Sequence, residues 1–275
     1  MLYSSRMVRR LAHFTTIAVL SLMPAFARGQ EVPQEVKNYL AYLALSITPP
    51  GALPPLVTRS MLGPASTGTS AGSTALRPQL AVRFGRATYE TDSPGENVHA
   101  NTYAVTGMLS AGEAATLSGT VGILDPTCAQ SDCDGQWIFS VGGDLALAGA
   151  QLGAESGSPR LTMGVNGEIG YTKKNDIDGL GLTAGVPIAL VTSSGGMKVV
   201  PFLIPAIGYG RSKVDVGEQQ YGAMRFLLGG GVSLLNIASA LSVNVGFQKI
   251  FFSADTGFGT ISSRTLFGVS ATLGR

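Results

Sequence analysis

The sequence predicts an all-β protein, a single closed antiparallel transmembrane β-barrel of about ten strands. Three observations predict this fold class. From about residue 79 the chain repeats segments of ten to fourteen residues in which apolar side chains alternate with small or polar ones. Glycine is frequent, at 37 of 275 residues, and only 13% of the residues are charged, as suits closely packed strands that face lipid. The connections between segments alternate between long and short, which is typical of bacterial membrane barrels.

The segment 240–248 has the clearest alternation. One set of its side chains is apolar: Leu241, Val243, Val245 and Phe247. The other set is polar or small: Ser242, Asn244, Gly246 and Gln248. Successive side chains of a strand point to opposite faces, so this strand has one apolar and one polar face. A closed sheet satisfies its backbone groups within the membrane, with lipid outside and polar groups inside.

The first residues are typical of a secretion signal. Arg6, Arg9 and Arg10 precede a short apolar run, and Ala25-Phe26-Ala27 resembles a cleavage site. We therefore expect a signal peptide over residues 1–27. Cleavage would remove three of the 19 basic residues and leave 16 against 17 acidic ones, so the sequence offers no basic surface for a nucleic acid.

Residues 28–78 differ from the rest and predict an N-terminal periplasmic extension with a linker. Apolar residues at helical spacing favour a short amphipathic helix over 34–47, which Pro49-Pro50 ends. A second pair, Pro54-Pro55, and a Ser/Thr/Gly/Ala-rich stretch follow. Two interpretations stay open for this region: a loosely ordered extension outside the barrel, or a plug that folds into it.

The remaining residues, 79–275, form the predicted barrel. Its ten strands are expected over 79–89, 100–110, 114–124, 136–149, 160–171, 179–192, 197–211, 221–235, 240–252 and 262–273. An even number brings both ends of the wall to one side of the membrane. The structural alternative is an eight-stranded barrel in which 79–89 and 100–110 are not wall strands.

The odd-numbered connections are mostly longer, and most acidic residues lie in or beside them. Aromatic side chains gather at the same strand ends, which predicts the outer half of an aromatic girdle. Its members are Tyr89, Tyr103, Trp137, Tyr171, Tyr209, Tyr221 and Phe251.

Leader and strand pattern together resemble the small outer-membrane β-barrel proteins of Gram-negative bacteria. The resemblance covers residues 1–27 and 79–275. It implies a location in the outer membrane, with extracellular loops, contact with outer-membrane lipid and lipopolysaccharide, and insertion by the barrel-assembly machinery. Such barrels commonly end in an aromatic residue, whereas here Phe267 is the last aromatic and the chain ends at Arg275.

Alternation also predicts which charged residues face the lumen. These are Arg83, Asp144, Glu168, Arg225 and Arg264. A cation that faced lipid at the bilayer midplane would cost about 2–4 kcal/mol, so inward placement is favoured. We expect these groups to pair as a structural network, because a lone desolvated charge is less stable than a paired one. The alternative is a charged constriction that selects solutes.

Two cysteines, Cys128 and Cys133, lie in a polar stretch with three carboxylates. Export favours a small disulfide loop between them. A calcium site is the alternative, although the spacing matches no EF-hand loop. The sequence predicts no cofactor and no metal site built from paired His or Cys residues.

His99 is the one histidine outside the leader, with Asp92 and Ser93 nearby. The Asp-x-His or His-x-Ser pairs of barrel enzymes are absent from His99-Ala100-Asn101. The sequence therefore favours a non-enzymatic protein with a structural or surface-interaction role. The alternatives are a narrow porin-like channel for small polar solutes, a lipid A-modifying enzyme at the rim, and a soluble barrel of lipocalin type with its apolar face inside.

Overall fold

The computed structural model describes residues 53–62, 76–91, 98–112, 114–127, 135–153, 158–174, 177–194, 196–214, 219–238, 240–252 and 261–274. Three predicted features lie outside these residues: the signal peptide, the helix over 34–47, and the pair Cys128 and Cys133. Among the described residues, no helix is both long and apolar enough to cross a bilayer.

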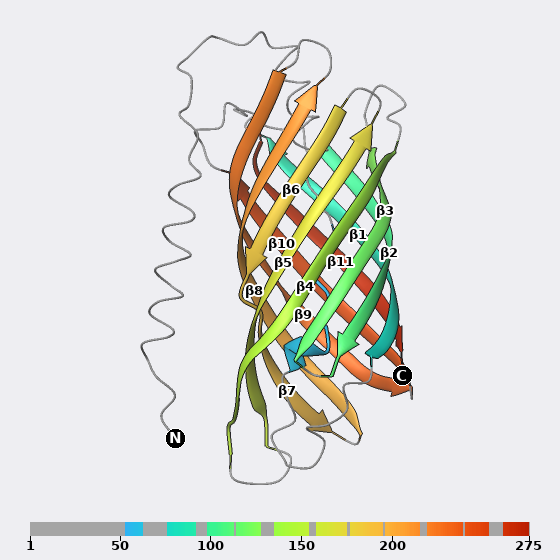
Figure 1. Ribbon diagram of the computed structural model, residues 1–275, viewed down its shortest axis with the longest axis vertical. Helices are drawn as coiled ribbons and strands as arrows, with labels where there is room; N and C mark the ends of the chain where they lie inside the picture. The colour runs from blue at the N-terminus through green and yellow to red at the C-terminus, as the bar shows by residue number, and fades with distance from the viewer. Residues whose placement is uncertain are drawn as a thin grey trace, which may run out of the picture. The chain divides into compact units, whose positions relative to one another are not determined.

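The wall consists of antiparallel strands in the order of the sequence (Figure 1). The strands are β1 (Leu76–Thr91), β2 (Val98–Ala111), β3 (Ala115–Thr127), β4 (Gln136–Gln151), β5 (Arg160–Lys174), β6 (Ile177–Gly185), β7 (Ile188–Ser194), β8 (Met197–Val214), β9 (Gln219–Ala238), β10 (Leu241–Phe252) and β11 (Ile261–Gly274). β1 pairs with both β2 and β11, and β4 pairs with both β3 and β5, so the sheet closes on itself.

Segments β6 and β7 are two halves of one wall strand, because both pair with β5 and with β8. The break falls at Val186 and Pro187, and Pro187 has no N–H to give to the sheet. Backbone hydrogen bonds to the neighbouring strands continue across the break: the Gly164 N–H donates to the Pro187 carbonyl, and the Val186 N–H donates to the Pro205 carbonyl. The wall is therefore a closed ten-stranded barrel, as the sequence predicted, and the eight-stranded alternative is excluded.

The two ends of the barrel differ. We call the end with connections 92–97, 128–135, 175–176, 215–218 and 253–260 the loop end, and the opposite end the turn end. The turn end holds the connections 112–114 and 195–196, where Gly112 and Gly196 have φ of 62° and 86°. Both termini of the wall also lie there, since Gln79 pairs with Gly274.

Exposure alternates along the strands and sorts side chains into two faces. On β1, Leu80, Val82 and Phe84 are exposed on the outside, whereas Ala81 and Arg83 are buried inside. The pattern recurs on β11, where Val269 and Leu273 are exposed and Ser270 and Thr272 are buried. A barrel with an apolar outer face and many polar inward side chains is stable when lipid hydrocarbon, and not water, surrounds that outer face. This arrangement excludes the soluble lipocalin-type alternative.

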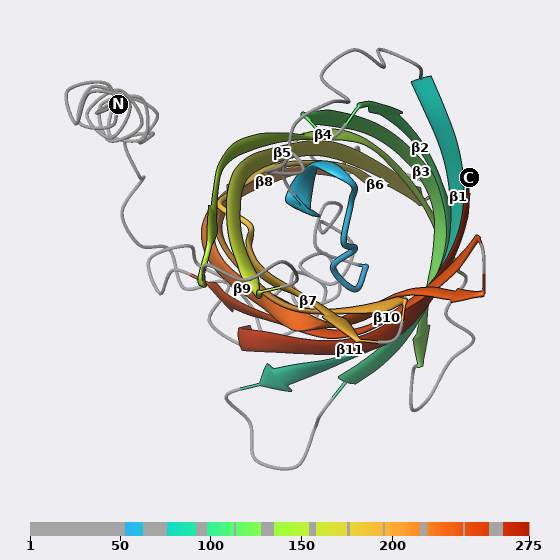
Figure 2. The same cartoon turned by 90° about the horizontal axis from the view of Figure 1, so that it is seen from below.

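Residues 53–62 lie inside the barrel (Figure 2) and end in a short 3-10 helix, η1 (Ser60–Leu62). We call this segment, Leu53–Leu62, the plug. Its Val57 and Met61 form an apolar cluster with Val200, Phe202 and Ile204 of β8. The sequence left two interpretations open for residues 28–78, an extension outside the barrel or a plug within it. For residues 53–62 the structure shows the plug. The apolar side chains explain it, because inside the barrel they are removed from water.

Candidate functional site

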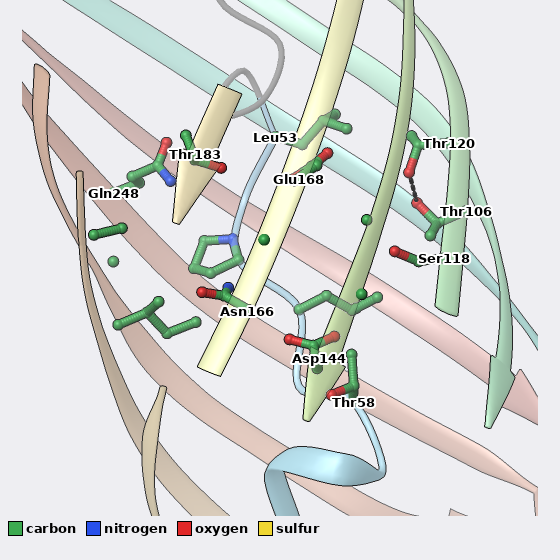
Figure 3. A pocket seen from close by; sticks show the side chains of 18 of the residues that line it. Leu53, Thr58, Thr106, Ser118, Thr120, Asp144, Asn166, Glu168, Thr183 and Gln248 are labelled. Carbon is green, nitrogen blue, oxygen red and sulfur yellow. Dashed lines mark hydrogen bonds between the residues drawn. The ribbon is translucent and has the colours of Figure 1, made fainter. Parts of the chain in front are cut away.

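The centre of the barrel contains a polar cavity of about 100 Å³ between the plug and the wall (Figure 3). Three of the predicted lumen charges line it: Arg83 from β1, Asp144 from β4 and Glu168 from β5. The plug contributes Leu53 and Thr58. A cavity of this volume has room for a few water molecules, but it is smaller than the usual site for a metabolite.

The two carboxylates reach this cavity because they lie at neighbouring inward positions of paired strands. Asp144 is opposite Asn166, and Glu168 is opposite Gly142. Gly142 leaves the space that Glu168 occupies, since a Cβ at Gly142 would lie 3.2 Å from Glu168 Cγ. Asp144 contacts the hydroxyl of Thr58 in the plug through a hydrogen bond. The carboxylates therefore face both each other and the plug.

Arg83 fixes one side of the plug. Its guanidinium donates to the carbonyl oxygen of Pro54, and it also donates to Thr106 Oγ1 at 3.4 Å. Thr106 lies 2.9 Å from the hydroxyl of Thr120 on the next strand. These contacts join Arg83 to the plug backbone and to a row of threonines. That the lumen charges pair with one another as a network stays a prediction.

The opposite side of the plug is fixed near the turn end. Thr162 Oγ1 on β5 donates to the Met61 carbonyl at 2.6 Å, and Arg160 donates to the Leu62 carbonyl. Ser60 Oγ donates to Thr116 Oγ1 on β3 at 3.2 Å. Together with Arg83, these contacts hold the plug from β1, β3 and β5.

A row of inward-facing glycines makes room for the two plug prolines. Gly85, Gly268 and Gly246 are direct neighbours across β1, β11 and β10. A Cβ at Gly268 would lie 2.5 Å from Pro54 Cγ, and one at Gly246 would lie 3.2 Å from Pro55 Cγ. The glycines permit the plug backbone to approach the wall. We call Gly85, Gly246 and Gly268 the glycine floor.

The remaining predicted lumen charges lie elsewhere in the lumen. Arg264 and Arg225 are buried, with 0% and 5% of their surface exposed. Neither lines the central cavity. They lie toward the loop end, because Arg264 is opposite Tyr89 and Arg225 is opposite Phe252. Arg264 donates to Gln248 Oε1 at 3.5 Å. The five charges are thus divided between two levels of the barrel.

Aromatic side chains of the predicted girdle face outward near the loop end. Tyr103, Trp137, Tyr171 and Phe251 are exposed, and Tyr209 is half-buried. Phe84 and Tyr103 pack with ring centroids 5.3 Å apart, and Phe226 and Phe251 with centroids 6.2 Å apart. The side chains of Tyr89 and Tyr221 lie outside the described residues. Whether these residues act as a girdle stays a prediction.

His99 lies near the loop end of β2, half-buried, with its Nδ1 3.2 Å from the Thr88 hydroxyl. Asp92 and Ser93 lie outside the described residues. Within the described part of the chain, no group of three or more His, Cys, Asp or Glu side chains could hold a metal ion.

Sequence reasoning missed the plug contacts and the glycine floor. The inward position of Arg83 followed from alternation, but its partner did not, because Pro54 had been assigned to a linker. One signal was available: Gly85, Gly246 and Gly268 all fall at inward positions of their strands, where a barrel without a plug would place larger side chains.

No family model matches the sequence, and no curated protein matches it. Solved structures do match the fold. Ail, the attachment invasion locus protein of Yersinia pestis, is 9% identical over 72% of this chain and 98% of its own, with a TM-score of 0.31. The outer membrane protease OmpT from Escherichia coli is 8% identical over 76% and 99%, with a TM-score of 0.36. LpxR from Salmonella typhimurium is 9% identical over 70% and 99%, with a TM-score of 0.38.

These values express a likeness of barrel architecture and no more. The membrane assignment rests instead on this chain's own geometry, the apolar exterior and polar lumen of its closed wall. The fold is that of an outer-membrane β-barrel protein.

Proposed function

We propose that this protein is a non-enzymatic outer-membrane β-barrel whose lumen is closed by its own plug, with a structural or surface-interaction role. One observation carries the proposal: the plug is buried inside the wall and is held by hydrogen bonds from β1, β3 and β5. A barrel near this size is largely filled by side chains even without a plug. The plug occupies part of the remaining space, so the loops at the loop end of the barrel are left as the surface for partners.

Conductance in planar bilayers tests the closed lumen. We expect the full chain to show no steady ohmic steps. A variant without residues 53–62 should conduct, provided that it still inserts as a folded barrel. Steady steps from the full chain, with a size that Arg83→Ala or Arg225→Ala changes, would contradict the closed version.

A narrow channel for small polar solutes is the second candidate, and the central cavity favours it. This cavity is lined by the charged side chains of Arg83, Asp144 and Glu168. Rings of charged side chains are typical of the constriction of a selective channel. Its volume of about 100 Å³ is small, so conduction would require the plug to move. The same bilayer experiment separates the two candidates.

We also propose that the protein does not modify lipid A. This proposal rests on His99, whose described hydrogen-bond partner is the hydroxyl of Thr88 and not a carboxylate. Mass spectra of lipid A from cells with and without the gene should be identical. A new lipid A species that disappears in a His99→Ala strain would show an enzyme instead.

The proposed location is the outer membrane after removal of residues 1–27, with the loop end outside and the turn end in the periplasm. The proposed surroundings are outer-membrane lipid and lipopolysaccharide, after insertion by the barrel-assembly machinery. Heat-modifiable gel migration of the protein from an outer-membrane fraction tests the closed barrel and the compartment together. Cleavage of the loops by protease added to intact cells tests the orientation.

A further inference from the structure

The plug runs from the middle of the lumen to the turn end. Pro54 lies against Gly268 of the glycine floor, about halfway along β11. At the other end of the plug, the Leu62 carbonyl accepts a hydrogen bond from Arg160, the first residue of β5 at the turn end. The C-terminal end of the plug therefore faces the turn end, where β1 begins. The chain that precedes Leu53 has to start from the middle of the lumen.

A return of this preceding chain to the turn end would have to pass beside the plug. The wall holds the plug from several sides, by hydrogen bonds from β1, β3 and β5 and by apolar packing on β8. The central cavity leaves about 100 Å³ between plug and wall, which is room for a few water molecules and not for a second stretch of chain. A second cavity, of about 340 Å³, lies at the turn end, beyond the central one. These contacts favour a path toward the loop end instead.

The loop-end half of the lumen contains a second row of inward glycines. Gly170 of β5, Gly181 of β6 and Gly210 of β8 are direct neighbours across three strands, and all three are buried. They lie one inward position nearer the loop end than Glu168 and Thr183, which line the central cavity. In the glycine floor, missing side chains make room for the plug prolines. We call this second set, Gly170, Gly181 and Gly210, the upper glycine row, and it offers the same kind of space to a second segment of chain.

Other strands line the loop-end half with aliphatic side chains. Four of these side chains point inward with at most 2% of their surface exposed: Leu124, Ile138, Ile250 and Leu266. Aliphatic groups are stable at inward positions when other apolar groups, and not water, cover them. The segment that precedes the plug carries such groups, among them Val36, Leu40 and Leu43.

We propose that the chain preceding the plug, residues 28–52, passes over the upper glycine row and leaves the barrel at the loop end. Its length suffices, because 25 residues span up to about 80 Å when extended and about 40 Å when helical. From Gly85 in the glycine floor, β1 continues for only six residues to Thr91, about 20 Å. The barrel thereby carries the N-terminal end of its own mature chain to the face on which its loops lie. That this face is the cell surface rests on the orientation proposed above, whereas the path through the lumen does not.

An epitope tag tests the path in the full chain. The tag is placed after Gln30 and, in two reference proteins, in the loop-end connection 215–218 or in the turn-end connection 195–196. Antibody binding is compared between intact and permeabilised cells. We expect the tags after Gln30 and in 215–218 to be detected on intact cells, and the tag in 195–196 only after permeabilisation. The inference is overturned if the tag after Gln30 is detected together with the tag in 195–196.

The same experiment separates this inference from the proposed orientation. If the tags after Gln30 and in 215–218 are both hidden on intact cells while the tag in 195–196 is detected, the orientation is wrong and the path through the lumen stands.

Gly181→Leu tests the upper glycine row. The new side chain would occupy the space above the row, so the tag after Gln30 should no longer be detected together with the tag in 215–218. Gly119→Leu is the matched control, because Gly119 faces outward and a Cβ there meets nothing within 4 Å. Heat-modifiable migration verifies that both variants fold. Equal detection of the tag in the two folded variants would show that the chain does not pass over this row, and would overturn that part of the proposal.

Discussion

Arg83 joins the wall directly to the plug. It is inward-facing on β1, 9% exposed, and its guanidinium donates to the Pro54 carbonyl. Burial of a guanidinium is unfavourable unless hydrogen bonds replace the lost water. Here a backbone carbonyl and a threonine hydroxyl do so for the two terminal nitrogens, while Nε has no hydrogen-bond partner among the described residues. The residue therefore connects the plug to the wall.

Arg83→Ala should lower the free energy of unfolding by about 1–3 kcal/mol, because it leaves the Pro54 carbonyl without its donor. Arg86→Ala is the control: Arg86 lies three residues further along β1, on the exposed outward face. Its loss should change stability by no more than about 0.5 kcal/mol. Urea titration of the barrel in lipid vesicles, followed by the fluorescence of Trp137, measures both. Equal effects of the two variants would contradict the role of Arg83.

The plug, as an element, depends on the shape of the wall beneath it. Pro54 and Pro55 rest on the glycine floor, and Val57 and Met61 pack against β8. Hydrogen bonds from three strands then set its position. Apolar packing stabilises the plug inside the barrel, and the hydrogen bonds fix its position within the lumen.

Gly268→Ala should displace the plug and strain the wall beside it, since the new Cβ would lie 2.5 Å from Pro54 Cγ and 2.4 Å from the Phe84 carbonyl oxygen of β1. Overpacking of this kind costs about 1–3 kcal/mol. Gly119→Ala is the matched control, because a Cβ at Gly119 meets nothing within 4 Å. Trypsin provides the measurement: cleavage after Arg59, in the plug, should accelerate in Gly268→Ala and stay at the level of the unmodified protein in Gly119→Ala. Unchanged cleavage in both would mean that the glycine floor does not set the plug position.

The whole molecule is a closed wall whose two faces meet different surroundings. Outward side chains such as Val82 and Val245 are 57% and 59% exposed, although both are apolar. Inward neighbours such as Asn244 are buried and polar. This reversal of the usual distribution is stable only where lipid covers the exterior.

Val245→Arg should lower the free energy of unfolding in vesicles by about 2–4 kcal/mol, the cost of a cation against lipid at the midplane. Val245→Leu, which keeps the surface apolar, should be close to neutral. Spin labels give an independent readout. A label at Val245 should be accessible to oxygen dissolved in lipid, and a label at Ser242 should be accessible to a water-soluble nickel complex. The opposite accessibilities would contradict the assignment of faces.

The sequence by itself determined the ten-stranded wall and which residues face outward. Two-residue periodicity is a local property, so Leu80, Val82 and Phe84 could be assigned to the lipid face without knowledge of their neighbours. It also placed Arg83, Asp144 and Glu168 inside. It could not supply the partners of these charges, because those partners lie on other strands or in the plug.

Only the tertiary structure decided that Leu53–Leu62 lies in the lumen, with a polar cavity between it and the wall. The segment carries no strong period of its own, and its prolines are as suited to a linker as to a plug. What selects the plug is a surface assembled from Gly85, Gly246 and Gly268. Gly246 and Gly268 already face each other in the β10–β11 hairpin, and Gly85 joins them only when β1 pairs with β11 and the barrel closes. The same closure brings Arg59, Arg160 and Lys198 around one cavity. Long-range pairing therefore creates both the plug site and the cavity at the turn end.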